Sequence, residues 1–82
     1  MTDADIMQEL TEIARETLLD DDLVLTRDMW GSDIVGWSSI MLVEMVLAAQ
    51  ERFNIRIPAD EADKFRSMGD FADFVAAKTA SK

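Results

Sequence analysis

The sequence predicts an all-α fold: a four-helix bundle with three long helices, one short helix and a long first loop. Three stretches repeat apolar residues at steps of three and four, which is the period of a helix with one buried face. Only residues 55–57 hint at a strand, and that stretch is too short and isolated to form a sheet. With 82 residues the chain is expected to be a single domain, 1–82, ordered over about residues 3–78.

The first helix is expected in residues 2–19, where Ile6, Leu10 and Ile13 recur at helical spacing. Thr2 or Asp3 is the expected N-cap, because a short polar side chain there accepts a hydrogen bond from a free amide. Acidic residues in the first turn suit the positive end of the helix dipole.

Residues 19–38 break the helical period and are expected to form a long loop with room for a short helical turn. Loops longer than about 12–15 residues in compact domains are usually functional or disordered. Here eight apolar residues are expected to anchor the loop over the helices: Leu23, Val24, Leu25, Met29, Trp30, Ile34, Val35 and Trp37. The two tryptophans fit loop anchors better than a ligand-stacking platform.

The second helix is expected to follow Ser38 and Ser39 and to be the most apolar element. Its apolar stripe, read from helical spacing, is Ile40, Val43, Val46 or Leu47, and Phe53. Asn54 marks its expected end. One of the two serines can cap this helix, which leaves the other hydroxyl free.

A short third helix and a longer fourth helix complete the expected bundle. Pro58 and Ala59 can start the third helix. Ser67, with Asp70 three residues later, is typical of the start of the fourth. The apolar stripe of that helix is Met68, Phe71, Phe74 and Val75.

Composition excludes several classes of protein. Cysteine and histidine are both absent, which removes disulfides, thiolate metal sites and the usual general base near neutral pH. We therefore expect no enzyme and no catalytic residue. The run Asp20–Asp22 is followed by residues without the alternating acids and glycine of an EF-hand, so no specific metal site is expected.

The net charge of −9 repels nucleic acid and favours partners with basic docking surfaces. No apolar run is long enough for a membrane span, and residues 1–10 lack the layout of a secretory signal. We expect a cytoplasmic monomer.

The stretch GWSSIMLVEMVLAAQERFNIRIP resembles the modification segment of acyl carrier proteins. The family signature is Gly, any residue, Asp, Ser, Leu, followed by a helix of the type VELV and then, after a Phe, by Ile-Pro. The matching positions here are Gly36, Ser39, Ile40, Val43, Glu44, Met45, Val46, Phe53, Ile57 and Pro58. Size, acidity, helix count and the long first loop agree over nearly the whole chain.

This resemblance implies that Ser39 carries a 4′-phosphopantetheine arm, transferred from coenzyme A by a phosphopantetheinyl transferase. The thiol of the arm would hold acyl groups as thioesters for loading, transfer and condensing enzymes with basic docking surfaces. The implied partner-binding face consists of Ile40, Val43, Glu44, Leu47, Glu51, Asp60 and Glu61. Glu44 is the strongest candidate among the acids, because it lies about one turn from Ser39.

Two departures from the family pattern affect the interpretation. Ser38 stands where the family usually has Asp, which keeps a helix cap and loses a negative charge. Met41 and Leu42 stand at positions that are often more polar, where they either extend the core or widen an apolar patch. These departures favour a specialised carrier, in polyketide, lipid or other secondary biosynthesis, over the housekeeping fatty-acid carrier. The alternative is a carrier-like acidic interaction module without the arm.

Overall fold

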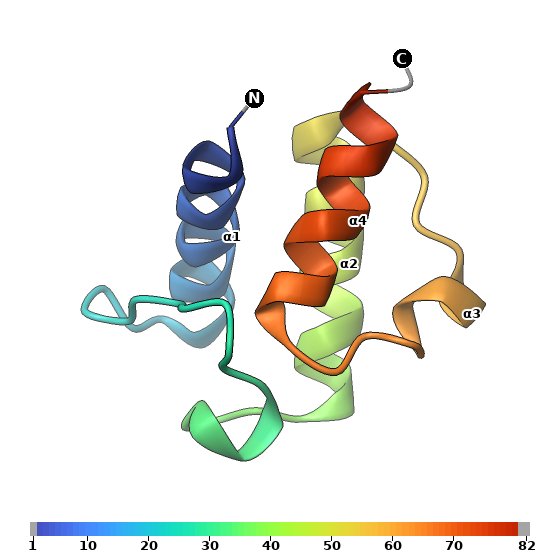
Figure 1. Cartoon of the computed structure of the whole chain (residues 1–82). Coiled ribbons are helices and arrows are strands. Elements are labelled where there is room, and N and C mark those ends of the chain that lie inside the picture. The colour runs from blue at the N-terminus through green and yellow to red at the C-terminus, as the bar shows by residue number, and fades with distance from the viewer. Residues whose placement is uncertain (1, 81–82) are drawn as a thin grey trace.

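The computed structural model describes residues 2–80, all of whose long elements are helical (Figure 1). Within this range there is no strand, so the all-α prediction is confirmed. A 3-10 turn, η1 (Gly31–Asp33), forms the expected short turn in the first loop. The helices are α1 (Asp3–Leu18), α2 (Ser39–Phe53), α3 (Ala59–Ala62) and α4 (Met68–Ala80).

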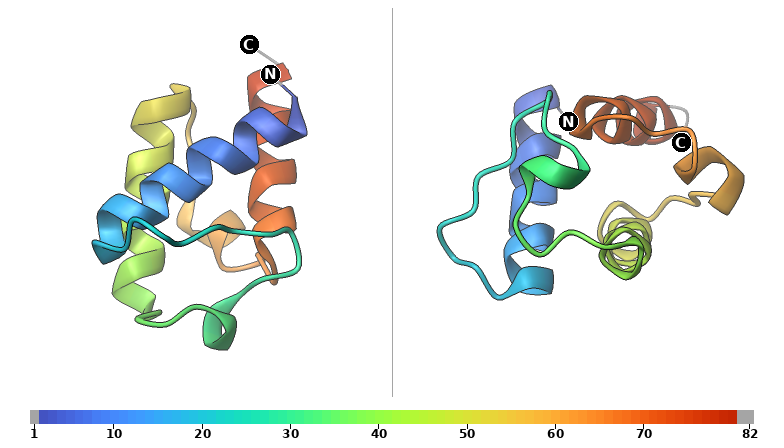
Figure 2. Two further views of the ribbon diagram at one scale, coloured as in Figure 1. Left: turned by 90° about the vertical axis from the view of Figure 1, so that its left-hand side faces the viewer. Right: turned by 90° about the horizontal axis from the view of Figure 1, so that it is seen from below.

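The three long helices enclose one core. α2 and α4 run in the same direction, and α1 crosses them and packs against both (Figures 1 and 2). Ile6, Leu10 and Ile13 of α1 are fully buried in this core, as their spacing predicts. α1 begins and α4 ends at one end of the bundle, whereas α2 begins at the opposite end.

Short polar side chains define the ends of the helices. The Thr2 hydroxyl accepts the Asp5 amide at 3.2 Å, and the Asp5 carboxylate accepts the Thr2 amide at 3.2 Å. The Ser67 hydroxyl accepts the Asp70 amide at 3.1 Å in the first turn of α4. α2 ends at Asn54, whose φ of 54° is the left-handed conformation that asparagine tolerates. These predicted helix boundaries are confirmed.

The apolar stripe predicted for α2 is wrong at Ile40, Val43 and Leu47 and right at Phe53. The buried face consists of Met41, Met45, Ala49 and Phe53. Ile40, Val43 and Leu47 lie on the outer face and are exposed. Met41 therefore extends the core, while Leu42 is only half-buried.

The backbone of the first loop is hydrogen-bonded to a side chain of α1 and to the backbone of α4. The buried Thr11 hydroxyl of α1 accepts the amide of Leu25 at 3.2 Å. At the start of α4, the amides of Met68 and Gly69 donate to the carbonyls of Met29 (2.9 Å) and Arg27 (2.8 Å). The Arg27 guanidinium also pairs with Asp3 of α1 and Asp73 of α4. Because of these contacts the loop has one fixed path.

Six of the eight predicted loop anchors pack inward, and two do not. Leu25 and Ile34 are buried, and the remaining four that pack against the core are half-buried: Leu23, Met29, Trp30 and Trp37. Val24 and Val35 were expected to be anchors, and this expectation is wrong: their exposed fractions are 59% and 94%. Their neighbours Leu25 and Ile34 occupy the inward positions instead.

Candidate functional site

Ser38 and Ser39 have different roles at the start of α2. Ser38 is the N-cap, and its hydroxyl accepts the amide of Met41 at 3.2 Å. Its carbonyl accepts the amide of Leu42 at 3.2 Å. Ser39 is the first helical residue and is exposed. The first serine is thus used for capping, which leaves the second available for chemistry.

The surroundings of Ser39 suit an attached phosphodiester. Among the described residues, neither its hydroxyl nor the amides of Ser39 and Ile40 have a hydrogen-bond partner. These two amides lie at the N-terminus of a 15-residue helix, where the positive end of the dipole stabilises an anion. A phosphate on the Ser39 oxygen would therefore find both space and donors.

The chain around Ser39 supplies no base that would activate the hydroxyl. The segment 34–43 contains no ionisable side chain. The nearest ionisable residue before it, Asp33, is occupied, since its carboxylate accepts the amide of Trp30 at 3.1 Å. A serine hydroxyl without a neighbouring base is a weak nucleophile. Activation of the Ser39 hydroxyl would therefore need a base from outside this segment.

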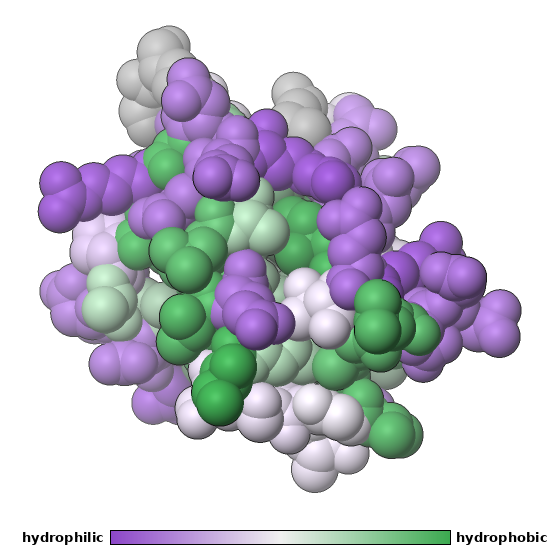
Figure 3. All heavy atoms as spheres, turned by 180° about the vertical axis from the view of Figure 1, so that it is seen from behind, coloured by the Kyte–Doolittle hydropathy of each residue, from purple (hydrophilic) through white to green (hydrophobic). Residues whose placement is uncertain are grey.

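The outer face of α2 brings together most of the residues implied as partner-binding. They recur at steps of three and four residues along the helix and are all exposed: Ile40, Val43, Glu44, Leu47 and Glu51. Figure 3 shows the molecule from behind, where hydrophobic side chains gather left of the centre and at the lower right, and hydrophilic ones lie mainly along the top and the sides. Three of the five side chains in this stripe are apolar and two are acidic, so the outer face of α2 is mainly hydrophobic.

The other two implied residues, Asp60 and Glu61, lie on α3 and thus on a separate short helix. Glu61 is partly neutralised by Lys64, whose nitrogen lies 3.5 Å from its carboxylate. Asp60 is exposed. The four acids expected along the second and third helices are therefore divided between two elements, and one of them is already paired.

A groove of about 240 Å³ lies between α2 and α3. Sequence reasoning did not find it, although the Ile57-Pro58 pair that turns the chain toward α3 was visible. The Gln50 side chain holds this turn in place, since its oxygen accepts the amide of Ile57 at 2.8 Å. The walls are mainly apolar: Leu42, Val43, Val46, Leu47, Ile57, Ala59 and Ala62, with Gln50 and Asp63.

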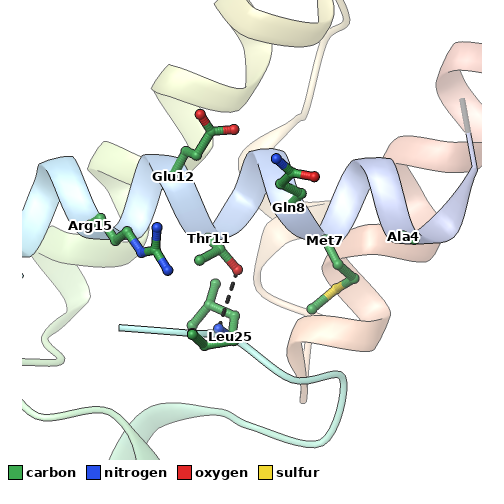
Figure 4. A pocket seen from close by; sticks show the side chains of 8 residues that line it. Ala4, Met7, Gln8, Thr11, Glu12, Arg15 and Leu25 are labelled. Atoms are coloured by element: carbon green, nitrogen blue, oxygen red, sulfur yellow. Dashed lines mark hydrogen bonds between the residues drawn. The ribbon is translucent and has the colours of Figure 1, made fainter. Parts of the chain in front are cut away.

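A larger hollow, of about 550 Å³, lies between α1 and the first loop (Figure 4). Met7 and Arg15 lean toward the loop, whereas Gln8 and Glu12 point away from Leu25. The Arg15 Nε donates to the carbonyl of Leu23 at 2.6 Å, so this side chain holds the loop. Since no residue of α2 or of the segment 34–43 lines the hollow, its size does not make it the functional site.

Two further features noted in the sequence are structural. The rings of Trp30 and Trp37 are tilted against each other with centroids 4.8 Å apart, and both are half-buried against the core. In the part of the chain that the structure describes, no group of three or more acidic side chains is arranged to hold a metal ion. Asp20 instead accepts the amide of Asp22 at 3.1 Å in a tight turn.

Comparison with known proteins identifies the class of this domain. A family model described as "Phosphopantetheine attachment site" matches residues 4–75. An acyl carrier protein of Guillardia theta is 32% identical over 81 residues, which cover 99% of this chain and 100% of that protein. An acyl carrier protein of Caulobacter vibrioides (strain NA1000 / CB15N) is 35% identical over 77 residues, covering 94% and 99%. The chain belongs to the acyl carrier protein family.

Solved structures agree with this assignment. The solution structure of the holo acyl carrier protein from Geobacter metallireducens superposes with a TM-score of 0.84 at 32% identity, over 93% of this chain and 87% of that one. The crystal structure of an acyl carrier protein from Thermotoga maritima has a TM-score of 0.84 at 24% identity, which is a likeness of fold.

Proteins of this family are carriers and not catalysts, and their carrier domain bears a covalently attached 4′-phosphopantetheine. Of the helices in residues 2–80, none combines the length and the hydropathy needed to cross a bilayer.

Proposed function

We propose that the Ser39 oxygen is the attachment point of the 4′-phosphopantetheine and that the chain carries acyl groups as thioesters on this arm. The observation that carries the proposal is the division of roles between the two serines. Ser38 caps α2, so Ser39 is exposed with a free hydroxyl beside two free amides. The arm would supply the thiol that the chain itself lacks, because the sequence contains no cysteine.

The attachment chemistry would be shared with a phosphopantetheinyl transferase. The Ser39 oxygen forms a bond to the phosphorus of coenzyme A that bears the pantetheine, the phosphoanhydride bond of coenzyme A breaks, and adenosine 3′,5′-bisphosphate leaves. The proton of Ser39 passes to a base of the transferase, since the segment 34–43 contains no ionisable side chain. This chain's contribution is an exposed oxygen, two amides that stabilise the new phosphodiester and a capped helix that holds both in place.

We propose a specialised pathway, in polyketide, lipid or other secondary biosynthesis. Two observations support this assignment over housekeeping fatty-acid synthesis. Ser38 replaces the usual aspartate, and the outer stripe of α2 is dominated by the exposed Ile40, Val43 and Leu47. The groove beside α3 has room for part of an apolar cargo, because its 240 Å³ is walled mainly by aliphatic side chains.

The proposed partners are the transferase and the acyl-loading, acyl-transfer and condensing enzymes of that pathway. The outer stripe of α2 would meet them, with Glu44 and Glu51 opposite basic residues and the apolar side chains at the centre of the contact. We place this work in the cytoplasm, where coenzyme A is available, and take the chain to act as a monomer of one domain.

The competing proposal, an acidic interaction module without the arm, is favoured by Ser38 alone. The deciding experiment incubates the chain and a Ser39→Ala variant with coenzyme A and a broad-specificity phosphopantetheinyl transferase, and measures intact mass. A gain of one phosphopantetheinyl group in the unmodified sequence alone is the expected result. If the mass stays unchanged, also with the transferase of the native host, the interaction module becomes the better explanation.

A further inference from the structure

The charge of this chain is unevenly distributed along its length. Residues 1–33, which form α1 and most of the first loop, contain ten acidic and two basic side chains. Residues 34–82 contain seven acidic and six basic side chains. The N-terminal segment therefore carries almost all of the net charge of −9. A protein that binds the α1 side of the molecule is expected to be basic there.

Glu12 is the acid of α1 that the rest of the chain leaves free. The other four acids of this helix are engaged in ion pairs or in the N-cap: Asp3, Asp5, Glu9 and Glu16. Within residues 2–80, the Glu12 carboxylate has no ion-pair or hydrogen-bond partner, and the residue is only half-buried. Its charge is therefore available to a group outside the chain.

Glu12 also lines the hollow of about 550 Å³ between α1 and the first loop (Figure 4). The apolar residues of this hollow are Ala4, Met7, Val24 and Leu25, and its polar residues besides Glu12 are Gln8, Thr11 and Arg15. Val24 is 59% exposed, so most of its side chain is uncovered in the free domain. Exposed apolar side chains beside a free charge are the composition of a protein–protein contact, with an apolar centre and a polar rim.

The loop wall of the hollow is held in place by α1. The Arg15 Nε donates to the carbonyl of Leu23 at 2.6 Å, and the Thr11 hydroxyl accepts the amide of Leu25 at 3.2 Å. These two bonds lie on either side of Val24 in the sequence and fix its backbone. A partner would therefore meet a wall that is already ordered, which lowers the entropy cost of binding.

The charges of the hollow are placed on different sides of it. Arg15 leans toward the first loop, where its guanidinium bonds the backbone, whereas Glu12 points away from Leu25 (Figure 4). A basic side chain of a partner would thus meet Glu12 at the α1 edge. Its apolar neighbours would meet Met7 and Val24.

We propose that this hollow is a docking site for a partner protein and that it takes a basic amphipathic segment of that partner. Apolar side chains of the segment contact Val24 and Met7, and a lysine or arginine pairs with Glu12. The acidic surroundings repel nucleic acid and anionic lipid, which leaves a basic protein segment as the occupant. The inference goes beyond the proposed attachment at Ser39 and does not depend on it.

The position of the hollow gives the docking site its consequence. No residue of α2 or of the segment 34–43 lines it, so a segment bound there leaves Ser39 and the outer stripe of α2 uncovered. One partner can therefore hold the domain while another acts at the start of α2. Two contacts made at once also raise the effective concentration of the second partner.

The test uses the amidated peptide KLAKLAKKLAKLAK as the probe, titrated into the 15N-labelled chain in about 0.15 M NaCl, which screens distant charges. Amide chemical shifts are expected to change for the residues that line the hollow and to stay constant for residues 38–43. Two control peptides separate charge from burial: ELAELAEELAELAE keeps the leucines, and KSAKSAKKSAKSAK keeps the lysines. Each is expected to bind at least about tenfold more weakly than the probe.

Two variants of the chain test the named contacts. Glu12→Lys and Val24→Ser are each expected to raise the Kd of the probe by a factor of about 3–10. Their matched controls lie on α2: Glu51→Lys makes an equal change of charge at an exposed acid, and Val43→Ser changes a valine that is 57% exposed. Both controls are expected to retain the Kd of the unmodified sequence.

The amide spectrum of each variant shows whether it is folded. The docking site is overturned if the probe does not bind, if the shift changes centre on α2, or if the control variants lose as much affinity as Glu12→Lys and Val24→Ser. Every readout is taken on the chain without an arm, so these outcomes are independent of whether Ser39 is modified. A failure of Ser39 to gain the arm would in turn leave the docking site intact.

Discussion

The Ser38 hydroxyl accepts the Met41 amide at 3.2 Å and so satisfies one of the free donors at the start of α2. Ser38→Ala removes this acceptor and is expected to lower the free energy of unfolding by about 1 kcal/mol. Ser38→Asp retains a cap and places a negative charge at the positive end of the helix, so its stability should equal or exceed that of the parent. Urea denaturation measures both. Equal stability of Ala and Ser at this position would contradict the capping role.

Glu44 is the acid of α2 that is proposed to dock closest to Ser39. Glu44→Lys reverses an exposed charge and should slow phosphopantetheine transfer without unfolding the domain, most strongly at low salt. Asp21→Lys, an equal change of charge in the first loop, is the control for net charge. If the two variants are slowed equally, or Glu44→Lys is not slowed, Glu44 has no specific part in docking.

Repulsion among the acids of residues 1–33 should limit the stability of the free domain. Added NaCl or a divalent salt is expected to raise the melting temperature, because screening weakens this repulsion. The exposed ion pairs of Arg27 and Arg52 work in the opposite direction but contribute little. Asp21→Asn/Asp22→Asn should reproduce part of the rise without salt. An unchanged melting temperature in both salts would contradict a destabilising repulsion among these acids.

Gly69 lies so close to the first loop that an added methyl group would crowd the backbone of Arg27. Its amide donates to the Arg27 carbonyl at 2.8 Å, and a Cβ would lie 3.1 Å from the same oxygen. Gly69→Ala should therefore destabilise the fold by about 1–3 kcal/mol through overpacking. Helix propensity alone predicts a gain of up to about 1 kcal/mol, so the sign of the change in a denaturation experiment separates the two effects.

The boundaries of the helices were predictable because they depend on local chemistry. Thr2, Ser67 and Asn54 act within three residues of their own positions, so their roles can be recognised in the sequence alone. The inward face of α2 was not predictable in this way. Residues 40–49 are apolar apart from Glu44, and a helix without polar contrast gives no signal that separates Met41 and Met45 from Ile40 and Val43.

The division of roles between the two serines was predictable, whereas the surroundings of Ser39 were less so. Two adjacent serines before an apolar helix indicate a cap and a free hydroxyl, and the structure assigns the cap to Ser38. The exposure of Val35 and the hydrogen bond from Leu25 to Thr11 depend on how a 20-residue loop crosses α1. Contacts between segments so far apart in sequence have no local signature.

The start of α1 and the end of α4 lie at one end of the bundle and Ser39 lies at the other, which matters for attaching the protein to a surface. α1 begins and α4 ends far from the start of α2. Immobilisation on a surface, or fusion to a reporter protein, through the start of α1 or the end of α4 would leave Ser39 exposed to solvent. Molecules anchored in this way would form an array in which every Ser39 faces outward and is accessible to an added enzyme.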